Sequence, residues 1–237
     1  MNYLKDVLLV NLEAFKKTVK KLHFVPLLAL ILIVIVYFQN FLINLLISRS
    51  DSVNFLLGFV RYLVNIVFMS LFLGILDDLI LYNRFRFSSL TSGYKNFFMQ
   101  VSQTMFVLVF FELICETILI KIDSQILLKI YKIFYWIIIS LLYEEIYIGQ
   151  RVGSDVYVNI FSFLKENILH WLVVLVAFIY INMRFEFYLL FGLLDLTLFI
   201  KAMLMALGFA FLYIYKGNLF YILNNSSVRK REFQRKL

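Results

Sequence analysis

The sequence has little charge for a protein of its length. Only 16% of its 237 residues are charged, whereas 63% are hydrophobic and the mean hydropathy is +0.89. Soluble domains carry roughly 25% charged residues, and no soluble fold of this length can bury so much Leu, Ile and Phe. The composition therefore excludes a soluble protein and predicts an all-α, polytopic membrane protein.

The sequence also lacks the residue patterns of known catalytic and metal centres. It contains no HExxH metal motif, no glycine loop for phosphate and no nucleophile motif, and its one cysteine, Cys115, cannot form an internal disulfide. His23 and His170 each immediately precede an aromatic residue at the start of an apolar run. This is the position of an interfacial belt. We therefore expect no enzyme activity, no cofactor and no metal.

Six apolar stretches reach or approach the roughly 20 residues that cross a bilayer. They cover residues 25–47, 53–76, 101–120, 125–143, 168–182 with a continuation to about 187, and 190–214, and the fifth is interrupted by Asn182, Arg184 and Glu186. Connections of only a few polar residues separate several of them, which predicts tight turns between antiparallel spans. The expected architecture is six transmembrane helices arranged as three hairpins.

Lysine and arginine are distributed unevenly between the two sets of loops. One set carries Lys5, Lys16, Lys17, Lys20, Lys21, Arg84, Arg86, Lys95, Arg151, Lys165, Lys216, Arg229, Lys230, Arg231, Arg235 and Lys236. The opposite set carries Arg49, Lys121 and Arg184. Basic loops stay in the cytoplasm, so we expect both termini there and the protein in the cell membrane. The net charge of +8 is spread around the spans, which favours anionic lipid and not nucleic acid as its partner.

One unit recurs along the chain. Residues 77–84 (DDLILYNR) align without a gap with residues 144–151 (EEIYIGQR), and residues 14–17 align with 93–96. Membrane proteins are often built from such repeats. The predicted divisions are a cytoplasmic helix at 1–24, a first hairpin at 25–82, repeat units at 83–149 and 150–216, and a basic tail at 217–237.

Each unit is expected to begin with an amphipathic helix at the membrane surface. In the first, Val7, Leu8, Val10, Leu12, Phe15, Val19 and Leu22 form a broad apolar face beside lysines. Phe97, Phe98 and Val101 suit the same role in the second unit, and Val156, Ile160, Phe161 and Leu164 suit it in the third. The alternative is that these helices dock a cytoplasmic protein such as an ATPase.

Two family resemblances follow from these segments. Residues 93–98 (GYKNFF) and 161–167 (FSFLKEN) resemble bacterial six-span membrane families with repeated amphipathic-helix and hairpin units, including the membrane region fused to some glycerophosphodiester phosphodiesterases. The chain contains no phosphodiesterase domain, so that activity is not implied. Residues 5–24 and 84–100 also resemble the interface helix and coupling helix of small ABC-2-type exporter permeases. That resemblance implies a cytoplasmic ATPase partner.

Charged residues inside the spans are the strongest functional candidates. Arg61, Glu112, Glu116, Lys129 and Lys132 lie in spans two to four, and Asp195 and Lys201 lie in span six. At about 1.5 Å per residue, the first five fall in the outer half of the membrane. We expect Glu112 and Glu116 to pair with Arg61 and Lys132. The cluster either fixes the register of the helices in the bundle or lines a cavity for a charged or amphiphilic substrate. Alternatively, the shallow lysines reach the outer headgroups without partners.

Two acidic pairs end the second and fourth spans. Asp77 and Asp78 occupy the same repeat positions as Glu144 and Glu145, although carboxylates are unfavourable at a helix C-terminus. Arg84 and Arg151 follow at equal spacing and are their expected partners. A divalent cation held by the four carboxylates is the alternative.

The sequence thus favours a non-catalytic membrane subunit of a transport, export or protective (immunity-like) assembly, working with a separate cytoplasmic ATPase or as a homo-oligomer. The alternative is a structural or lipid-interacting membrane protein that translocates nothing itself. Neither hypothesis specifies the substrate.

Overall fold

The computed structural model describes residues 3–46, 51–122, 125–191, 196–227, 230–231 and 233. This part of the chain is helical between short turns and contains no strand. The elements are α1 (Tyr3–Lys20), the short 3₁₀ helix η1 (Leu22–Phe24), α2 (Val25–Leu46), α3 (Asp51–Leu81), α4 (Ser88–Ile122), α5 (Gln125–Tyr147), α6 (Ser154–Phe191) and α7 (Leu196–Asn225). The all-α class is confirmed.

Five helices in the described part are long and apolar enough to cross a membrane, within α3, α4, α5, α6 and α7. A sixth is reached when α1 and the beginning of α2, which meet at 57°, are counted as one bent span. The single proline, Pro26, lies in the first turn of α2, where a missing backbone N–H costs no helical hydrogen bond. These lengths fit a multi-pass membrane protein.

The helices differ from the expected pattern where separate amphipathic segments were predicted. Helix α4 runs unbroken from Ser88 to Ile122, so the segment expected at 84–100 is a turn followed by the first turns of a span-length helix. In α6, a break in helical geometry occurs at Asn167 (φ −124°, ψ 15°). The amide nitrogen of Asn167 donates to the Phe163 carbonyl, and side chains of this type compete with helical hydrogen bonds.

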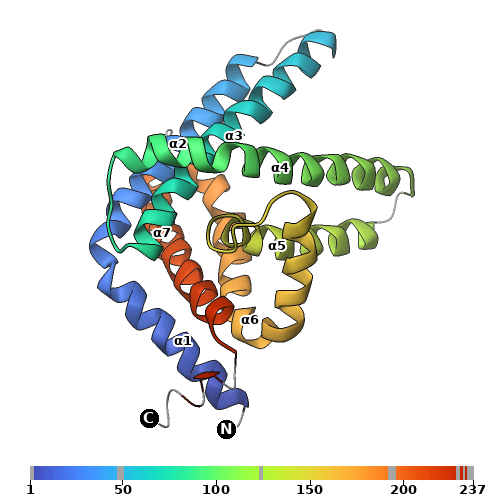
Figure 1. Cartoon of the computed structure of the whole chain (residues 1–237). Helices are drawn as coiled ribbons and strands as arrows, with labels where there is room; N and C mark the ends of the chain where they lie inside the picture. Colours follow the sequence, from blue (N-terminus) through green and yellow to red (C-terminus); the bar gives the residue numbers. More distant parts are fainter. Residues whose placement is uncertain are drawn as a thin grey trace.

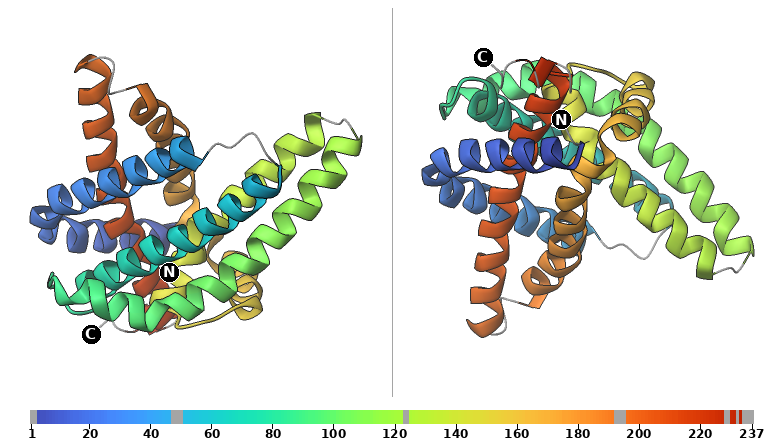
Figure 2. Two further views of the ribbon diagram at one scale, coloured as in Figure 1. Left: turned by 90° about the horizontal axis from the view of Figure 1, so that it is seen from above. Right: turned by 90° about the horizontal axis from the view of Figure 1, so that it is seen from below.

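Helix α7 is the centre of the bundle. It packs against α1, α2, α3, α5 and α6, whereas the most extensive single contact is between α3 and α4 (Figure 1). Figure 2 shows both termini on one side of the molecule, which we call the base, while the far ends of the pairs α2/α3, α4/α5 and α6/α7 diverge on the other side. The long helices therefore meet at the base and splay apart beyond it.

Helix α1 lies along the base with its small and polar residues inward. Its buried residues are Asp6, Val10, Ala14 and Thr18, at the four-residue spacing that follows one helix face. Its large apolar residues are exposed instead, namely Leu4, Leu8, Leu12, Phe15 and Val19, and so is Leu22 at the start of η1. Of the apolar face predicted from sequence, Val10 alone is fully buried.

Two glycines allow α3 and α4 to cross in backbone contact. A Cβ added at Gly93 would lie 2.7 Å from the Gly74 Cα and 2.9 Å from the Ser70 carbonyl oxygen, and one added at Gly74 would overlap the backbone of Gly93 and Ser89. Close approach through small residues is how helices gain packing energy in a membrane, where no hydrophobic effect drives them together. Since the two glycines lie on different helices, no GxxxG spacing marks them in the sequence.

We expect Gly74→Ala and Gly93→Ala each to lower the melting temperature of the purified protein, because the added methyl group has no space and overpacking costs roughly 1–3 kcal/mol. Gly58→Ala is the matched control, since nothing lies within 4 Å of a Cβ there. Fluorescence-detected size-exclusion melting of the three variants measures the difference. Equal melting temperatures for all three would contradict the close crossing.

Candidate functional site

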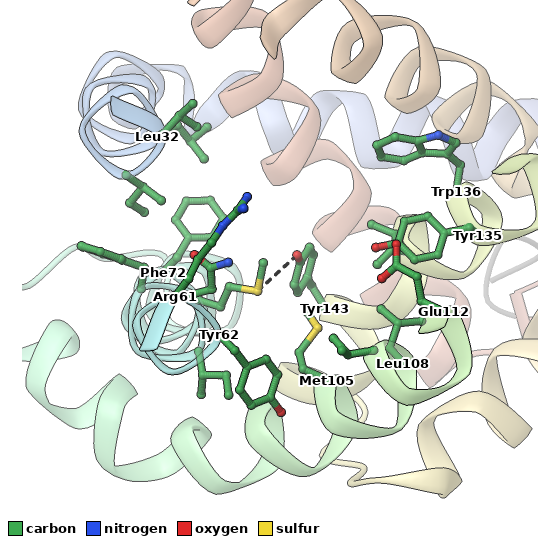
Figure 3. A pocket seen from close by; sticks show the side chains of 18 of the residues that line it. Leu32, Arg61, Tyr62, Phe72, Met105, Leu108, Glu112, Tyr135, Trp136 and Tyr143 are labelled. Carbon is green, nitrogen blue, oxygen red and sulfur yellow. Dashed lines mark hydrogen bonds between the residues drawn. The ribbon is translucent and has the colours of Figure 1, made fainter. Parts of the chain in front are cut away.

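A cavity of about 640 Å³ opens where the helices begin to splay. Residues of all six long helices line it, from Leu32 on α2 to Tyr213 on α7. The lining is mostly apolar and rich in aromatic rings, including Phe68, Phe72, Tyr135, Trp136, Tyr143, Phe178, Phe209 and Tyr213. Figure 3 shows the cavity with its aromatic wall.

Two walls of the cavity carry the charged and amide side chains. Arg61 and Asn65 come from α3, one helical turn apart, and Glu112 comes from α4. Figure 3 draws Arg61 and Glu112 on opposite sides, with Tyr143 between them. The hydroxyl groups of Tyr62 and Tyr143 are already engaged, since they donate to the Ser102 carbonyl (3.0 Å) and to the Met69 sulfur (3.4 Å).

The structure brings together two residues of the predicted intramembrane cluster. Arg61 and Glu112 line the same cavity, but no ion pair joins them, and Arg61 forms none with any described residue. Lys129 and Lys132 are exposed on α5 and lie outside the lining. We expected Arg61 and Lys132 to pair with Glu112 and Glu116. For Arg61 with Glu112, this expected pairing is wrong. The Glu116 side chain lies outside the described residues.

Of the second group of predicted intramembrane charges, the structure describes Lys201 alone. Lys201 is exposed on α7 and does not line the cavity. Asp195 lies outside the described residues.

Directly behind the aromatic wall lies a fully buried ion pair. The Lys216 ammonium is 3.2 Å from the Glu144 carboxylate, and neither side chain has solvent exposure. The same ammonium lies 4.4 Å from the ring centroid of Tyr213 and 4.8 Å from that of Phe178, and it donates to the Ser140 carbonyl. Tyr213 and Phe178 present their rings to the cavity, so Lys216 supports the cavity wall from behind.

Lys216 was counted among the cytoplasmic basic residues, and the structure corrects this. Helix α7 continues to Asn225, because the apolar run resumes after Lys216 with Leu219, Phe220, Ile222 and Leu223, all of them buried. That resumption is visible in the sequence and places Lys216 inside the apolar helix α7 and not in the tail that follows it.

The two acid and arginine sets share one local geometry. The Arg84 guanidinium lies 3.7 Å from Asp78, and Arg151 forms an ion pair with Glu145, in both cases the partner predicted from sequence. The backbone N–H of each arginine donates to the carbonyl of the same acid, and Asn83 and Gln150, 67 residues apart, both have φ 53°. The end of each helix is thus followed by a residue in the left-handed conformation and then by an arginine whose backbone N–H bonds the carbonyl six positions earlier.

The members of each acid pair therefore have different roles. Asp78 and Glu145 bind the arginine of the following turn, whereas Glu144 turns inward to Lys216 and Asp77 is half-buried beside Asp78. Among the described residues, no group of three or more Asp, Glu, His or Cys side chains is arranged to hold a metal ion.

A third charged group closes the base of the molecule. The Asp6 carboxylate accepts hydrogen bonds from Arg231 (2.7 Å) and lies 3.2 Å from the His170 ring, and all three side chains are buried. The prediction that the basic tail faces lipid is thus wrong for Arg231, whose side chain binds Asp6 of α1. The interfacial prediction is likewise wrong for His170, which is buried inside the protein, and fits only His23, which is exposed and whose ring centroid lies 3.9 Å from that of Phe24 at a tilt of 43°. No local sequence pattern links residues more than 160 positions apart.

Lys21 joins the same base from the junction of α1 and η1. Its ammonium donates to the Ile80 carbonyl and to the Asn218 side chain, both at 3.2 Å, and burial lowers the pKa of Lys21 to about 8. It therefore ties the first helix to the C-terminal end of α3, where backbone carbonyls have no helical partner, and to α7.

Comparisons with protein families, with curated proteins and with solved structures find no match to this chain.

The Glu144–Lys216 pair generates a double-mutant prediction. Removing one partner leaves an uncompensated buried charge, so we expect Glu144→Gln or Lys216→Met alone to cost about 3–5 kcal/mol. The double variant should be more stable than either single variant, because no charge remains. The matched control is the exposed pair of Glu13 and Lys17 (2.9 Å), whose loss should cost under about 1 kcal/mol. Thermal melts in detergent measure the two single variants and the double variant at each pair, and additive losses at Glu144 and Lys216 would argue against the pair.

Proposed function

We propose that this chain is a non-catalytic membrane protein that binds one lipid-like amphiphile in its central cavity. The observation that carries the proposal is the cavity itself: an open space of about 640 Å³ among membrane-length helices, walled by aromatic rings, with Arg61, Asn65 and Glu112 at its sides. A hydrocarbon chain fits the rings, and a polar headgroup fits the side chains of α3 or α4.

The size and lining of the cavity support this class of ligand. Binding sites for small molecules commonly occupy about 300–1,000 Å³ and combine an apolar lining with a few polar groups. A cavity among spans that diverge on one side of the molecule (Figure 2) can be reached from the bilayer, which is where an amphiphile resides. Nothing in the lining supplies a nucleophile with an adjacent base, so binding fits the site better than catalysis.

The base of the molecule supports a cytoplasmic orientation as part of the proposal. The exposed apolar residues of α1, such as Leu8 and Leu12, lie beside exposed Lys5, Lys16 and Lys20. A helix with this arrangement buries its apolar side among acyl chains and holds its lysines at anionic headgroups. The preference of positive charge for cytoplasmic surfaces then supports both termini lying inside the cell.

A transport or export subunit, or a subunit of a protective assembly, that depends on a cytoplasmic ATPase is the second candidate. It is favoured by the exposed basic residues that α4, α6 and the turn before α4 contribute, namely Arg84, Arg86, Lys95 and Lys165. Such a surface suits docking of a soluble partner. Purification in mild detergent separates the two candidates, because an ATPase that co-elutes favours transport and elution of the chain alone counts against it.

The chain has two tryptophans, and they test amphiphile binding in opposite ways. Trp136 lines the cavity, whereas Trp171 is fully buried and donates to Ser140. In nanodiscs containing increasing fractions of a brominated phospholipid, we expect a Trp171→Phe variant, which retains Trp136, to show quenching that saturates at a low brominated fraction. A Trp136→Phe variant, which retains Trp171, should show little quenching.

Lipid around the outside of the protein also quenches tryptophan, but in proportion to its mole fraction and without saturation. Gly58→Phe provides the control, since Gly58 lines the cavity and nothing lies within 4 Å of a Cβ added there, so that a large side chain at this position is expected to take up space in the cavity. Loss of the saturable quenching phase in this variant supports the site. Quenching that rises in proportion to the mole fraction of brominated lipid, and that Gly58→Phe leaves unchanged, would contradict the proposed function.

A further inference from the structure

We infer that the cavity selects amphiphiles with an anionic headgroup, and that Arg61 binds this headgroup. The inference rests on the proposed function and adds the chemical class of its ligand. It follows from the position and pairing of Arg61, from the side chain one turn along α3, and from what the remaining walls offer.

Arg61 is a permanent cation in a membrane-length helix. It lies within the apolar stretch Gly58–Leu81 of α3, and its guanidinium forms no ion pair with a described residue. Charges inside a membrane are costly and are retained where they pair with each other or with a substrate. An anion that enters the cavity supplies the missing counter-charge.

The neighbouring Asn65 completes a headgroup site. It follows Arg61 at i+4 and therefore shares its helix face, and both line the cavity. The Asn65 Oδ1 atom is buried and accepts no hydrogen bond in the described structure, which leaves a costly unsatisfied acceptor. A phosphate bound by the planar guanidinium, with a hydroxyl group of the same headgroup donating to Asn65, satisfies both side chains.

The remaining walls define where the rest of the ligand lies. Phe68 and Phe72 continue from Asn65 along α3, and Phe178 and Phe209 extend the apolar lining onto α6 and α7. Glu112 is on the opposite side from Arg61 (Figure 3), so the side chain that can bind an anion lies on the α3 wall alone. The cavity thus offers one anionic position at Arg61 and apolar space for acyl chains.

The test uses the full-length Trp171→Phe protein in nanodiscs and compares two brominated lipids, phosphatidylglycerol and phosphatidylcholine. We expect the saturable quenching of Trp136 to require roughly tenfold less phosphatidylglycerol, the change that one charge-assisted hydrogen bond provides. In Arg61→Gln the two lipids should become equivalent, because the selection for net negative charge is lost, and quenching by phosphatidylcholine should weaken much less than quenching by phosphatidylglycerol, since its phosphate also contacts the guanidinium. Lys132→Gln is the matched control, because it removes an exposed intramembrane cation that is outside the cavity, and it should keep the preference.

The outcomes separate this inference from the proposed function. Saturable quenching that is equal for both lipids in the unmodified cavity would overturn the role of Arg61 and leave amphiphile binding intact. Absence of saturable quenching by either lipid would overturn both. If Arg61→Gln does not fold, competition in the unmodified cavity decides: short-chain phosphatidylglycerol should displace the brominated lipid at roughly tenfold lower concentration than short-chain phosphatidylcholine, and equal displacement would contradict the inference.

Discussion

The Lys216 ammonium sits where no water reaches it, and the cavity depends on how its charge is compensated. Glu144 provides the counter-charge at 3.2 Å, and the rings of Tyr213, Phe178 and Tyr143 surround it. A buried pair of this kind contributes little net stability, but breaking it is costly. Its effect is on position: α5 and α7 must meet in one register, and three aromatic residues of the cavity wall are held against the pair.

Charged side chains also connect the helices at the base, where they join segments that are distant in sequence. Asp6 of α1 is held by Arg231 after α7 and by His170 of α6, and Lys21 connects to the carbonyl end of α3 and to α7. In a membrane protein such polar contacts substitute for the hydrophobic effect that holds soluble helices together. Polar contacts therefore hold the base together, whereas the helix pairs diverge on the opposite side (Figure 2).

Much of the fold is predictable from sequence because it follows from local patterns. Hydropathy gives the helices, and the repeated DDLILYNR and EEIYIGQR segments predict the pairing of Arg84 with Asp78 and of Arg151 with Glu145. What sequence cannot supply is distance between segments. The Gly74–Gly93 crossing, the contact of Asp6 with Arg231 and the orientation of Glu144 toward Lys216 each join separate helices, and no spacing rule encodes them. Arg61 and Glu112 were recognised as important, but their separation by a cavity depends on how α3 and α4 cross.

The account as a whole depends on a lipid-like molecule occupying the central cavity. Native mass spectrometry of the protein released from mild detergent measures this most directly, because bound lipid adds a discrete mass. We expect one lipid molecule to remain bound at collision energies that remove all detergent, and to be lost in the Gly58→Phe variant. A spectrum that shows only the bare chain, or the same distribution of lipid adducts in both proteins, would contradict the account.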